Sequence, residues 1–150
     1  MIECLSGAEA VARAPFIAGI LARAFSDPAQ RWSAESVAES CGTPGTLVLL
    51  APHGCALIRI VADEAELLAI ARDPIARGQG VGADLLDACI AEAGRAGAAR
   101  LYLEVASGNA AAIRLYRARG FQCDGRRAGY YGGEGGQDAL LMSCEVAPVS

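Results

Sequence analysis

The sequence predicts one α/β domain that spans residues 1–150. Three observations support this fold class: short apolar runs rich in β-branched residues, an amphipathic stretch with helical spacing after Gly82, and further alternation of strand and helix patterns beyond it. A chain of 150 residues is long enough to bury a core and too short for two ordinary domains. Because 53% of the residues are hydrophobic and 20% are charged, the composition is typical of a globular protein.

The first half of the chain has two helical and three strand-like segments. Pro15 interrupts the first helical pattern, since proline inside a helix removes a hydrogen bond. Ser33 is a typical N-cap residue for the second helix. Ala51-Pro52-His53-Gly54 has the composition of a turn between two apolar runs, which predicts a hairpin. The expected elements are helices at 8–25 and after Ser33, and strands at 46–50, 55–61 and 66–72.

The second half of the chain alternates between helix and strand patterns. Leu85, Leu86 and Cys89 belong to an apolar series at helical spacing, which predicts an amphipathic helix. Asn109 is a typical N-cap residue for a further helix, and Gly120 is placed to end it. The expected elements are a helix from Gly82 that closes at Gly94 to Gly97, a buried strand at 100–105, a helix from Asn109 to Gly120, and two strands within 121–146 around the glycine-rich segment 132–136.

Composition and charge exclude several classes of function. The formal net charge of −4 argues against nucleic acid as a partner, and no apolar run is long enough to cross a bilayer, so we expect a soluble cytoplasmic protein. All thirteen basic residues are arginine, which excludes a Schiff-base lysine and a P-loop lysine. With a single histidine and no Cys-x-x-Cys pair, we expect no metal site. The six scattered cysteines are interpreted as small buried hydrophobes: Cys4, Cys41, Cys55, Cys89, Cys123 and Cys144.

A glycine-rich turn joins the third strand to the amphipathic helix. Gly78, Gly80 and Gly82 alternate there, so backbone N–H groups are left unobstructed at the positive end of the helix. This arrangement predicts an anion site for a phosphate or pyrophosphate, and Arg77 beside it can add a charge-assisted hydrogen bond.

The same glycines also fit other interpretations. Gly78, Gly80 and Ala83 match a dinucleotide-binding pattern, with Glu104 about twenty residues further on. A tight turn that merely needs small residues is equally compatible with an isolated glycine triplet. Two features oppose the dinucleotide fold: residues 73–77 separate the strand from the glycines, and too few strand–helix units follow.

Three segments carry a resemblance to a known family. The segments are Asp73-Pro74-x-x-Arg77-x-x-Gly80-x-Gly82, then Leu103-Glu104-Val105, then Asn109-Ala110-Ala111-Ala112-Ile113-x-Leu115-Tyr116-x-x-x-Gly120-Phe121. Together they resemble the GNAT superfamily of N-acetyltransferases, and more narrowly the RimI family. The similarity continues through Arg126-Arg127-x-x-Tyr130-Tyr131 and Asp138-Ala139-Leu140-Leu141-Met142.

Three positions depart from the pattern of that family. Arg72 stands where an aliphatic residue is common, and Gly108 stands where a serine precedes the asparagine. Gln137 replaces an acidic residue before Asp138. Before Leu67 the similarity rests mainly on Trp32-Ser33, in the half that shapes the acceptor side in this family.

The resemblance implies a fold and a reaction. The fold is a mixed, mainly antiparallel sheet of about seven strands flanked by helices and splayed where coenzyme A enters. The reaction is direct transfer of an acetyl group from acetyl-CoA, without a metal, to the N-terminal α-amine of a protein. In the RimI family that acceptor is the N-terminal alanine of a small-subunit ribosomal protein.

The resemblance also implies roles for individual residues. Glu104 would be the general base and Tyr116 the general acid that protonates the sulfur of coenzyme A. On position alone, a solvated charge is the favoured interpretation of Glu104 and a core tyrosine the more frequent interpretation of Tyr116. Trp32, Tyr130 and Tyr131 would form the wall for an acceptor peptide. The implied cofactor-binding residues are Ile70, Ala71, Arg72, Arg77, Gly78, Gln79, Gly80, Val81, Gly82, Ala83 and Asn109.

Alternative functions remain open at this stage. A member of the same superfamily that acetylates a small-molecule amine would differ only in the acceptor half. A non-catalytic module that senses acetyl-CoA or a nucleotide is a second alternative. The dinucleotide-binding domain is the third, and it predicts NAD in place of coenzyme A.

Overall fold

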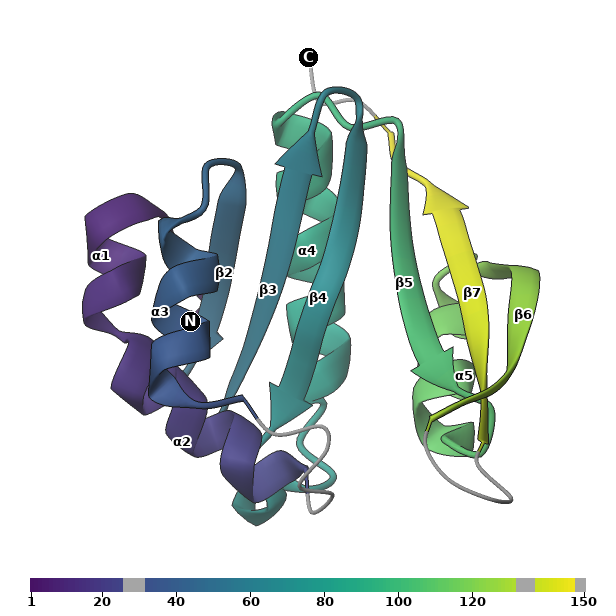
Figure 1. The fold of residues 1–150 in the computed structure, drawn as a ribbon, viewed down its shortest axis with the longest axis horizontal. Helices are drawn as coiled ribbons and strands as arrows, with labels where there is room; N and C mark the ends of the chain where they lie inside the picture. The colour runs from purple at the N-terminus through teal and green to yellow at the C-terminus, as the bar shows by residue number, and fades with distance from the viewer. Residues whose placement is uncertain (26–31, 132–136, 148–150) are drawn as a thin grey trace.

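A seven-stranded sheet runs through the molecule, and helices lie against both of its faces (Figure 1). The structure is a computed structural model that describes residues 1–25, 32–131 and 137–147. The strands are β1 (Glu3–Leu5), β2 (Thr46–Ala51), β3 (Gly54–Val61), β4 (Glu64–Arg72), β5 (Arg100–Ala106), β6 (Gln122–Tyr131) and β7 (Gln137–Glu145). The helices are α1 (Gly7–Ala12), α2 (Ala14–Ala24), α3 (Ala34–Gly42), α4 (Val81–Arg95) and α5 (Ala110–Ala118), with a short 3-10 turn, η2 (Pro74–Ala76), before α4.

The sheet is mixed and mainly antiparallel, as the resemblance implied. Its strand order is β1-β2-β3-β4-β5-β7-β6. Every neighbouring pair is antiparallel except β4 and β5, which run parallel because α4 crosses over between them. The predicted α/β class and the sheet of about seven strands are therefore confirmed.

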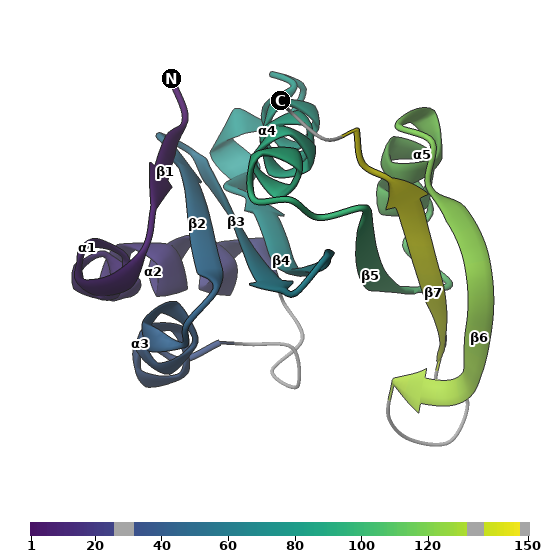
Figure 2. The same ribbon diagram turned by 90° about the horizontal axis from the view of Figure 1, so that it is seen from above.

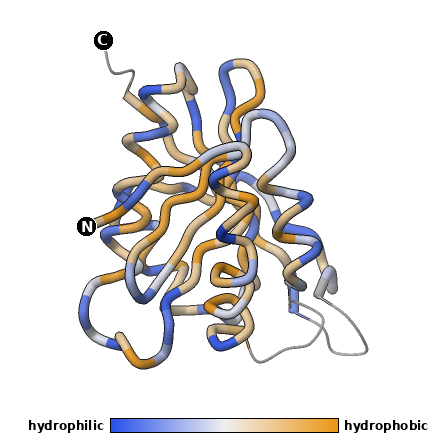
Figure 3. Tube along the Cα trace, turned by 90° about the vertical axis from the view of Figure 1, so that its left-hand side faces the viewer, coloured by the Kyte–Doolittle hydropathy of each residue, from blue (hydrophilic) through white to orange (hydrophobic). Residues whose placement is uncertain are grey.

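Two hydrophobic cores lie on opposite faces of the sheet. Helices α1, α2 and α3 cover one face of the first four strands, and α4 lies on the other face, the same side as α5 (Figure 2). Along β3, Cys55 and Leu57 belong to the core on the α1–α3 side, whereas Ala56 and Ile58 belong to the core on the α4 side. Successive side chains of a strand point to opposite faces, so β3 is buried on both. Figure 3 shows mostly hydrophobic chain through the middle of the molecule.

The first helical segment differs from the prediction. Residues 8–25 were expected to form one helix, but the structure has α1 and α2 with Arg13 between them. Pro15 lies in the first turn of α2, where its missing N–H group needs no partner within the helix. Ser33 caps α3 as predicted, since its hydroxyl oxygen accepts a hydrogen bond from the N–H of Ser36 at 3.0 Å. The three-residue strand β1 was not anticipated.

The parallel strands β4 and β5 separate soon after they begin. Residues 64–66 pair with residues 100–102, and the two strands then diverge towards their C-terminal ends (Figure 1). Ile58 pairs with Leu67 and Leu57 with Ala69, so Leu68 is an extra residue that forms a β-bulge in β4. From residue 67 to residue 72, the edge of β4 that faces β5 pairs with no strand of the described chain. Its backbone polar groups are therefore available to a ligand.

Candidate active site

A cleft of about 1360 Å³ opens where β4 and β5 part. Four structural pieces form most of its wall: the end of β4, the glycine-rich turn with the start of α4, the end of β5, and the first turns of α5. Residues from the end of α2 and from β6 complete it on another side. The segments that resembled the acetyltransferase family, far apart in the sequence, thus meet in one place.

The end of β4 contributes Ile70, Ala71 and Arg72 to the lining. These residues follow the bulge at Leu68. Their backbone lies on the edge of β4 that β5 leaves open. This edge can pair with an extended ligand as one strand pairs with another.

The glycine-rich turn forms the start of α4. Gly80 is the N-cap and has a φ of 73°, and Gly78 has a φ of 81°, a region that residues with a Cβ rarely adopt. Gly82 also lines the cleft, so the first N–H groups of α4 lie beside it at the positive end of the helix. Val81 and Ala83 line the cleft as well, whereas the exposed Arg77 and Gln79 are not among its lining residues.

Glu104 lies near the end of β5 and lines the cleft. Leu103 and Val105 on either side of it point into the core, so Glu104 projects from the opposite face of the sheet. Its side chain is 30% exposed and forms an ion pair with Arg127 of β6, with Oε1 and Nη2 2.9 Å apart. Cζ of Arg127 is also 5.0 Å from the ring centroid of Tyr130. Glu104 is therefore a paired and oriented carboxylate at the wall of the cleft.

Arg127 is a residue whose position the sequence did not reveal. The sequence shows it only as part of the family-like segment Arg126-Arg127-x-x-Tyr130-Tyr131. In the sheet Arg127 pairs with Ala139 of β7, and the small side chain of Ala139 lets the long arginine reach across β7 to Glu104 on β5. Its contact with Glu104 depends on the register of three strands, which local sequence patterns do not give.

Helix α5 contributes two of the predicted residues to the cleft, Asn109 and Tyr116. Asn109 caps the helix, since its Oδ1 accepts a hydrogen bond from the N–H of Ala112 at 3.2 Å. Tyr116 is 5% exposed, and its ring packs against Phe121 with 5.6 Å between the ring centroids. Both residues therefore belong to the part of α5 that borders the cleft.

Two of the three residues expected at the acceptor wall are among the residues that line the cleft. Trp32 and Tyr130 line the cleft, and Tyr130 is 51% exposed. Ala24 and Phe25 at the end of α2 also line the cleft, which no sequence pattern indicated. Tyr131 is the last residue of β6 and pairs with Gln137, but its side chain lies outside the described part of the chain, as do residues 132–136.

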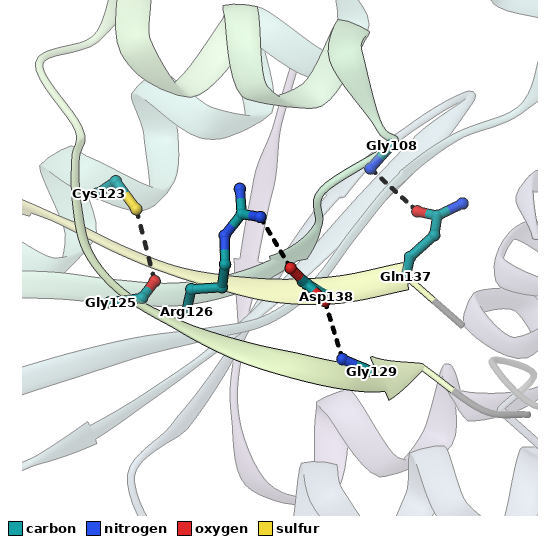
Figure 4. Close-up of polar contacts among 7 residues, drawn as sticks. All are labelled: Gly108, Cys123, Gly125, Arg126, Gly129, Gln137 and Asp138. Carbon is teal, nitrogen blue, oxygen red and sulfur yellow. Dashed lines mark hydrogen bonds and ion pairs between the residues drawn. The ribbon is translucent and has the colours of Figure 1, made fainter. Parts of the chain in front are cut away.

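Polar contacts hold the β6–β7 hairpin beside the start of α5 (Figure 4). The N–H of Gly108 donates to Oε1 of Gln137 at 3.0 Å, so two departures from the family pattern contact each other. A Cβ on Gly108 would lie 2.7 Å from the same oxygen, which leaves no room for a serine against this glutamine conformer. Asp138 accepts hydrogen bonds from Arg126 Nη1 and from the N–H of Gly129, both at 2.8 Å.

The Asp138 contacts predict a pH dependence of stability. The N–H of Gly129 and the guanidinium of Arg126 hold the pKa of Asp138 below its usual range. A lowered folded-state pKa contributes stability that is fully present above the unfolded-state value of about 3.9 and is lost as the pH falls through the folded-state value. We expect Asp138→Asn to lower the melting temperature at neutral pH and the difference from wild type to shrink below about pH 4. A difference that is unchanged down to pH 2 would contradict this role.

Other kinds of site find no support in the described part of the chain. No group of three or more His, Cys, Asp or Glu side chains among the described residues is arranged to hold a metal ion. No helix within the described ranges is long and apolar enough to cross a membrane. All six cysteines are described, and none of them lines the cleft.

Comparisons with known proteins identify acetyltransferases as relatives of this chain. A sequence model of the acetyltransferase (GNAT) family matches residues 17–121. The [ribosomal protein bS18]-alanine N-acetyltransferase of Escherichia coli K12 is 37% identical over 121 residues, which cover 77% of this chain and 82% of that protein. The crystal structure of the Escherichia coli ribosomal-protein-S18-alanine N-acetyltransferase superposes with a TM-score of 0.83 at 32% identity, covering 100% of this chain and 97% of that one.

A more distant likeness is to nourseothricin acetyltransferase. That crystal structure has a TM-score of 0.60 and 31% identity, and the match covers 69% of this chain and 66% of the other. Since the family model spans more than half of the chain and the Escherichia coli relative exceeds 30% identity over most of its length, the chain belongs to the GNAT family of acetyltransferases.

Proposed function

We propose that the protein transfers the acetyl group of acetyl-CoA to the N-terminal α-amine of a protein, and that the acceptor begins with alanine, as in ribosomal protein bS18. The observation that best supports this reaction is the β4–β5 cleft. The glycine-rich turn forms one part of its wall, and Glu104 and Tyr116 lie at other parts. The acceptor is proposed from the relatives named for bS18 alanine acetylation, which match most of the chain.

The cleft fits acetyl-CoA as a substrate. Its diphosphate would lie on the N–H groups of the turn around Gly78 and Gly80, whose positive φ angles shape the start of α4. The amide-containing pantetheine arm would pair with the open edge of β4 at residues 67–72. Acetyl-CoA supplies an acetyl group that is activated as a thioester.

The acceptor amine must lose a proton to act as a nucleophile. An α-amino group has a reference pKa of about 8, against about 10.4 for a lysine side chain, so an α-amine is the easier acceptor to deprotonate. We assign this proton transfer to Glu104, directly or through a water molecule. Its ion pair with Arg127 fixes the position of the carboxylate at the cleft wall.

The remaining groups would stabilise the transition state and the leaving thiolate. Backbone N–H groups around Ile70, Ala71 and Arg72 would polarise the thioester carbonyl, and donors of this kind are commonly worth about 3 kcal/mol of barrier. The hydroxyl of Tyr116 would donate its proton to the departing sulfur.

Direct transfer fits better than an acyl-enzyme intermediate. The nucleophile of such an intermediate would be a thiolate near the thioester. Burial raises the pKa of the Cys55 thiol to about 12, and burial raises that of Cys89 further. None of the six cysteines lines the cleft, so the amine itself is the proposed nucleophile.

Acetylation of a small-molecule amine is the second candidate. The likeness to nourseothricin acetyltransferase favours it, since that match has 31% identity and includes the same fold. The two candidates differ in what the wall at Trp32 and Tyr130 accepts. That wall would have to fit an extended peptide backbone in the first case and a compact polyamine in the second.

Thiol release from acetyl-CoA with a panel of acceptors distinguishes the candidates. The panel contains an Ala-initiated peptide, the same peptide with a formylated α-amine, spermidine and an aminoglycoside. The proposal predicts turnover with the free Ala-initiated peptide and none with its formylated form. Turnover confined to spermidine or the aminoglycoside supports the second candidate, and tight acetyl-CoA binding without any turnover indicates a non-catalytic binding module.

A further inference from the structure

Charge in the cleft is carried by two side chains on opposite walls. Among the described residues that line the cleft, Arg72 is the one basic side chain and Glu104 is the one acidic side chain. Arg77, to which the sequence assigned the cationic contact, is exposed and is not part of this lining. A polyanionic ligand in the cleft would therefore meet its cationic partner at the end of β4.

The side chain of Arg72 leaves β4 on the face that α4 covers. Arg72 pairs with Gly54 of β3, and residues directly opposite each other in an antiparallel pair project to the same face. A Cβ on Gly54 would lie 2.6 Å from Cγ1 of Val81 and 2.9 Å from Cδ1 of Leu85, both in the first turns of α4. Arg72 is therefore directed towards the N-terminal end of α4, where the glycine-rich turn presents its N–H groups.

The guanidinium of Arg72 has a donor that the described chain does not satisfy. Nε is buried and has no hydrogen-bond partner among the described residues. The carboxylate of its neighbour Asp73 accepts hydrogen bonds from Arg23 at 2.9 Å and from the N–H of Ile75 at 3.3 Å, and not from Arg72 Nε. Buried donors are nearly always paired in folded proteins, so the unpaired Nε shows that hydrogen bonds within the described chain do not fully hold the Arg72 side chain.

We propose that the guanidinium of Arg72 binds the diphosphate of the acetyl donor, together with the N–H groups at the start of α4. A guanidinium presents several N–H donors in a planar fork that matches phosphate oxygens, and its hydrogen bonds to an anion are charge-assisted. Because the family pattern has an aliphatic residue here, this contact is a feature of the present chain. The inference rests on the proposed use of acetyl-CoA.

Calorimetric binding to three ligands tests the assignment. The ligands are coenzyme A, 3′-dephospho-coenzyme A, which keeps the diphosphate, and pantetheine, which lacks all the phosphates. The proteins are the wild type, Arg72→Met, which keeps an unbranched apolar stem without the guanidinium, and Arg72→Lys, which keeps the charge. We expect Arg72→Met to weaken both coenzyme A and 3′-dephospho-coenzyme A by about 10- to 100-fold, with a smaller loss in Arg72→Lys. Pantetheine should bind the wild type and Arg72→Met equally.

Each other outcome overturns a defined part of the inference. Equal affinity of the wild type and Arg72→Met for coenzyme A would show that the Arg72 guanidinium does not contact the ligand. If Arg72→Met loses affinity for coenzyme A but not for 3′-dephospho-coenzyme A, Arg72 contacts the 3′-phosphate and not the diphosphate. An equal loss with pantetheine indicates a structural role instead. If the wild type binds none of the three ligands, the result contradicts the proposed use of acetyl-CoA, on which the Arg72 contact depends.

The unliganded variant provides an independent readout. Arg72→Met removes a buried donor that lacks a partner in the described chain, so we expect its melting temperature without ligand to equal or exceed that of the wild type. Coenzyme A should then raise the melting temperature of the wild type more than that of the variant. A variant that melts well below the wild type without ligand would show that Arg72 is held by internal contacts, against the proposal.

Discussion

Glu104→Gln is expected to lower kcat for acetylation of an Ala-initiated peptide by about 100- to 10,000-fold, because positioned general bases contribute rate factors of this size. Glutamine keeps the shape of the side chain but cannot take the proton of the acceptor amine. Thiol release at saturating acetyl-CoA measures the effect. Since the substitution leaves the turn and the edge of β4 unchanged, the affinity for coenzyme A should stay within about threefold of the wild type.

Glu145→Gln is the matched control for this substitution. Glu145 ends β7 with a side chain that is 90% exposed, and it lies 3.8 Å from Arg100, outside the residues that line the cleft. It makes the same chemical change at a position remote from the proposed reaction. Turnover by Glu104→Gln at the level of this control would remove Glu104 from the role of base.

Tyr116→Phe is the second substitution with a large expected effect. We expect kcat to fall by about 100-fold or more, because the departing thiolate loses its proton donor. The phenylalanine ring can keep the contact with Phe121 at 5.6 Å, and thermal unfolding of the variant measures any structural effect of losing the hydroxyl. The loss should appear in kcat, whereas the KM for acetyl-CoA should change little.

Tyr102→Phe is the control for Tyr116→Phe, because it removes a phenol hydroxyl at a position outside the cleft lining. Tyr102 lies on β5, two residues before Glu104, and is not part of the cleft lining. Full turnover is expected for this control. If Tyr116→Phe retains wild-type turnover, another group must protonate the sulfur. If both tyrosine variants lose activity together with their melting temperature, the effect is structural.

Local sequence patterns predicted most of the elements because periodicity and capping act over a few residues. The helical spacing after Gly82 gave α4, and Ser33 and Asn109 marked the helix starts that their side chains cap. Pro15 carried an ambiguous signal, since a proline breaks a helix interior but is favoured in a first turn. Only the packing of α1 and α2 against β2–β4 decides between these outcomes.

Local sequence patterns could not predict the contacts between distant segments of the chain. The ion pair of Arg127 with Glu104 requires the order β5-β7-β6 and the register of both strand pairs. The contact of Gly108 with Gln137 likewise links two departures from the family pattern that looked independent in the sequence. The glycine-rich turn was found from sequence, but local patterns did not show that Arg72, on the strand before it, lines the cleft while Arg77 does not.

The position of the acetyl group on a peptide with two kinds of amine tests the central claim most directly. An Ala-initiated peptide that also contains a lysine is incubated with acetyl-CoA and the protein, and tandem mass spectrometry locates the added acetyl group. The account predicts acetylation at the α-nitrogen of alanine and an unmodified lysine. Acetyl on the lysine side chain, or no acetylated product, would contradict it.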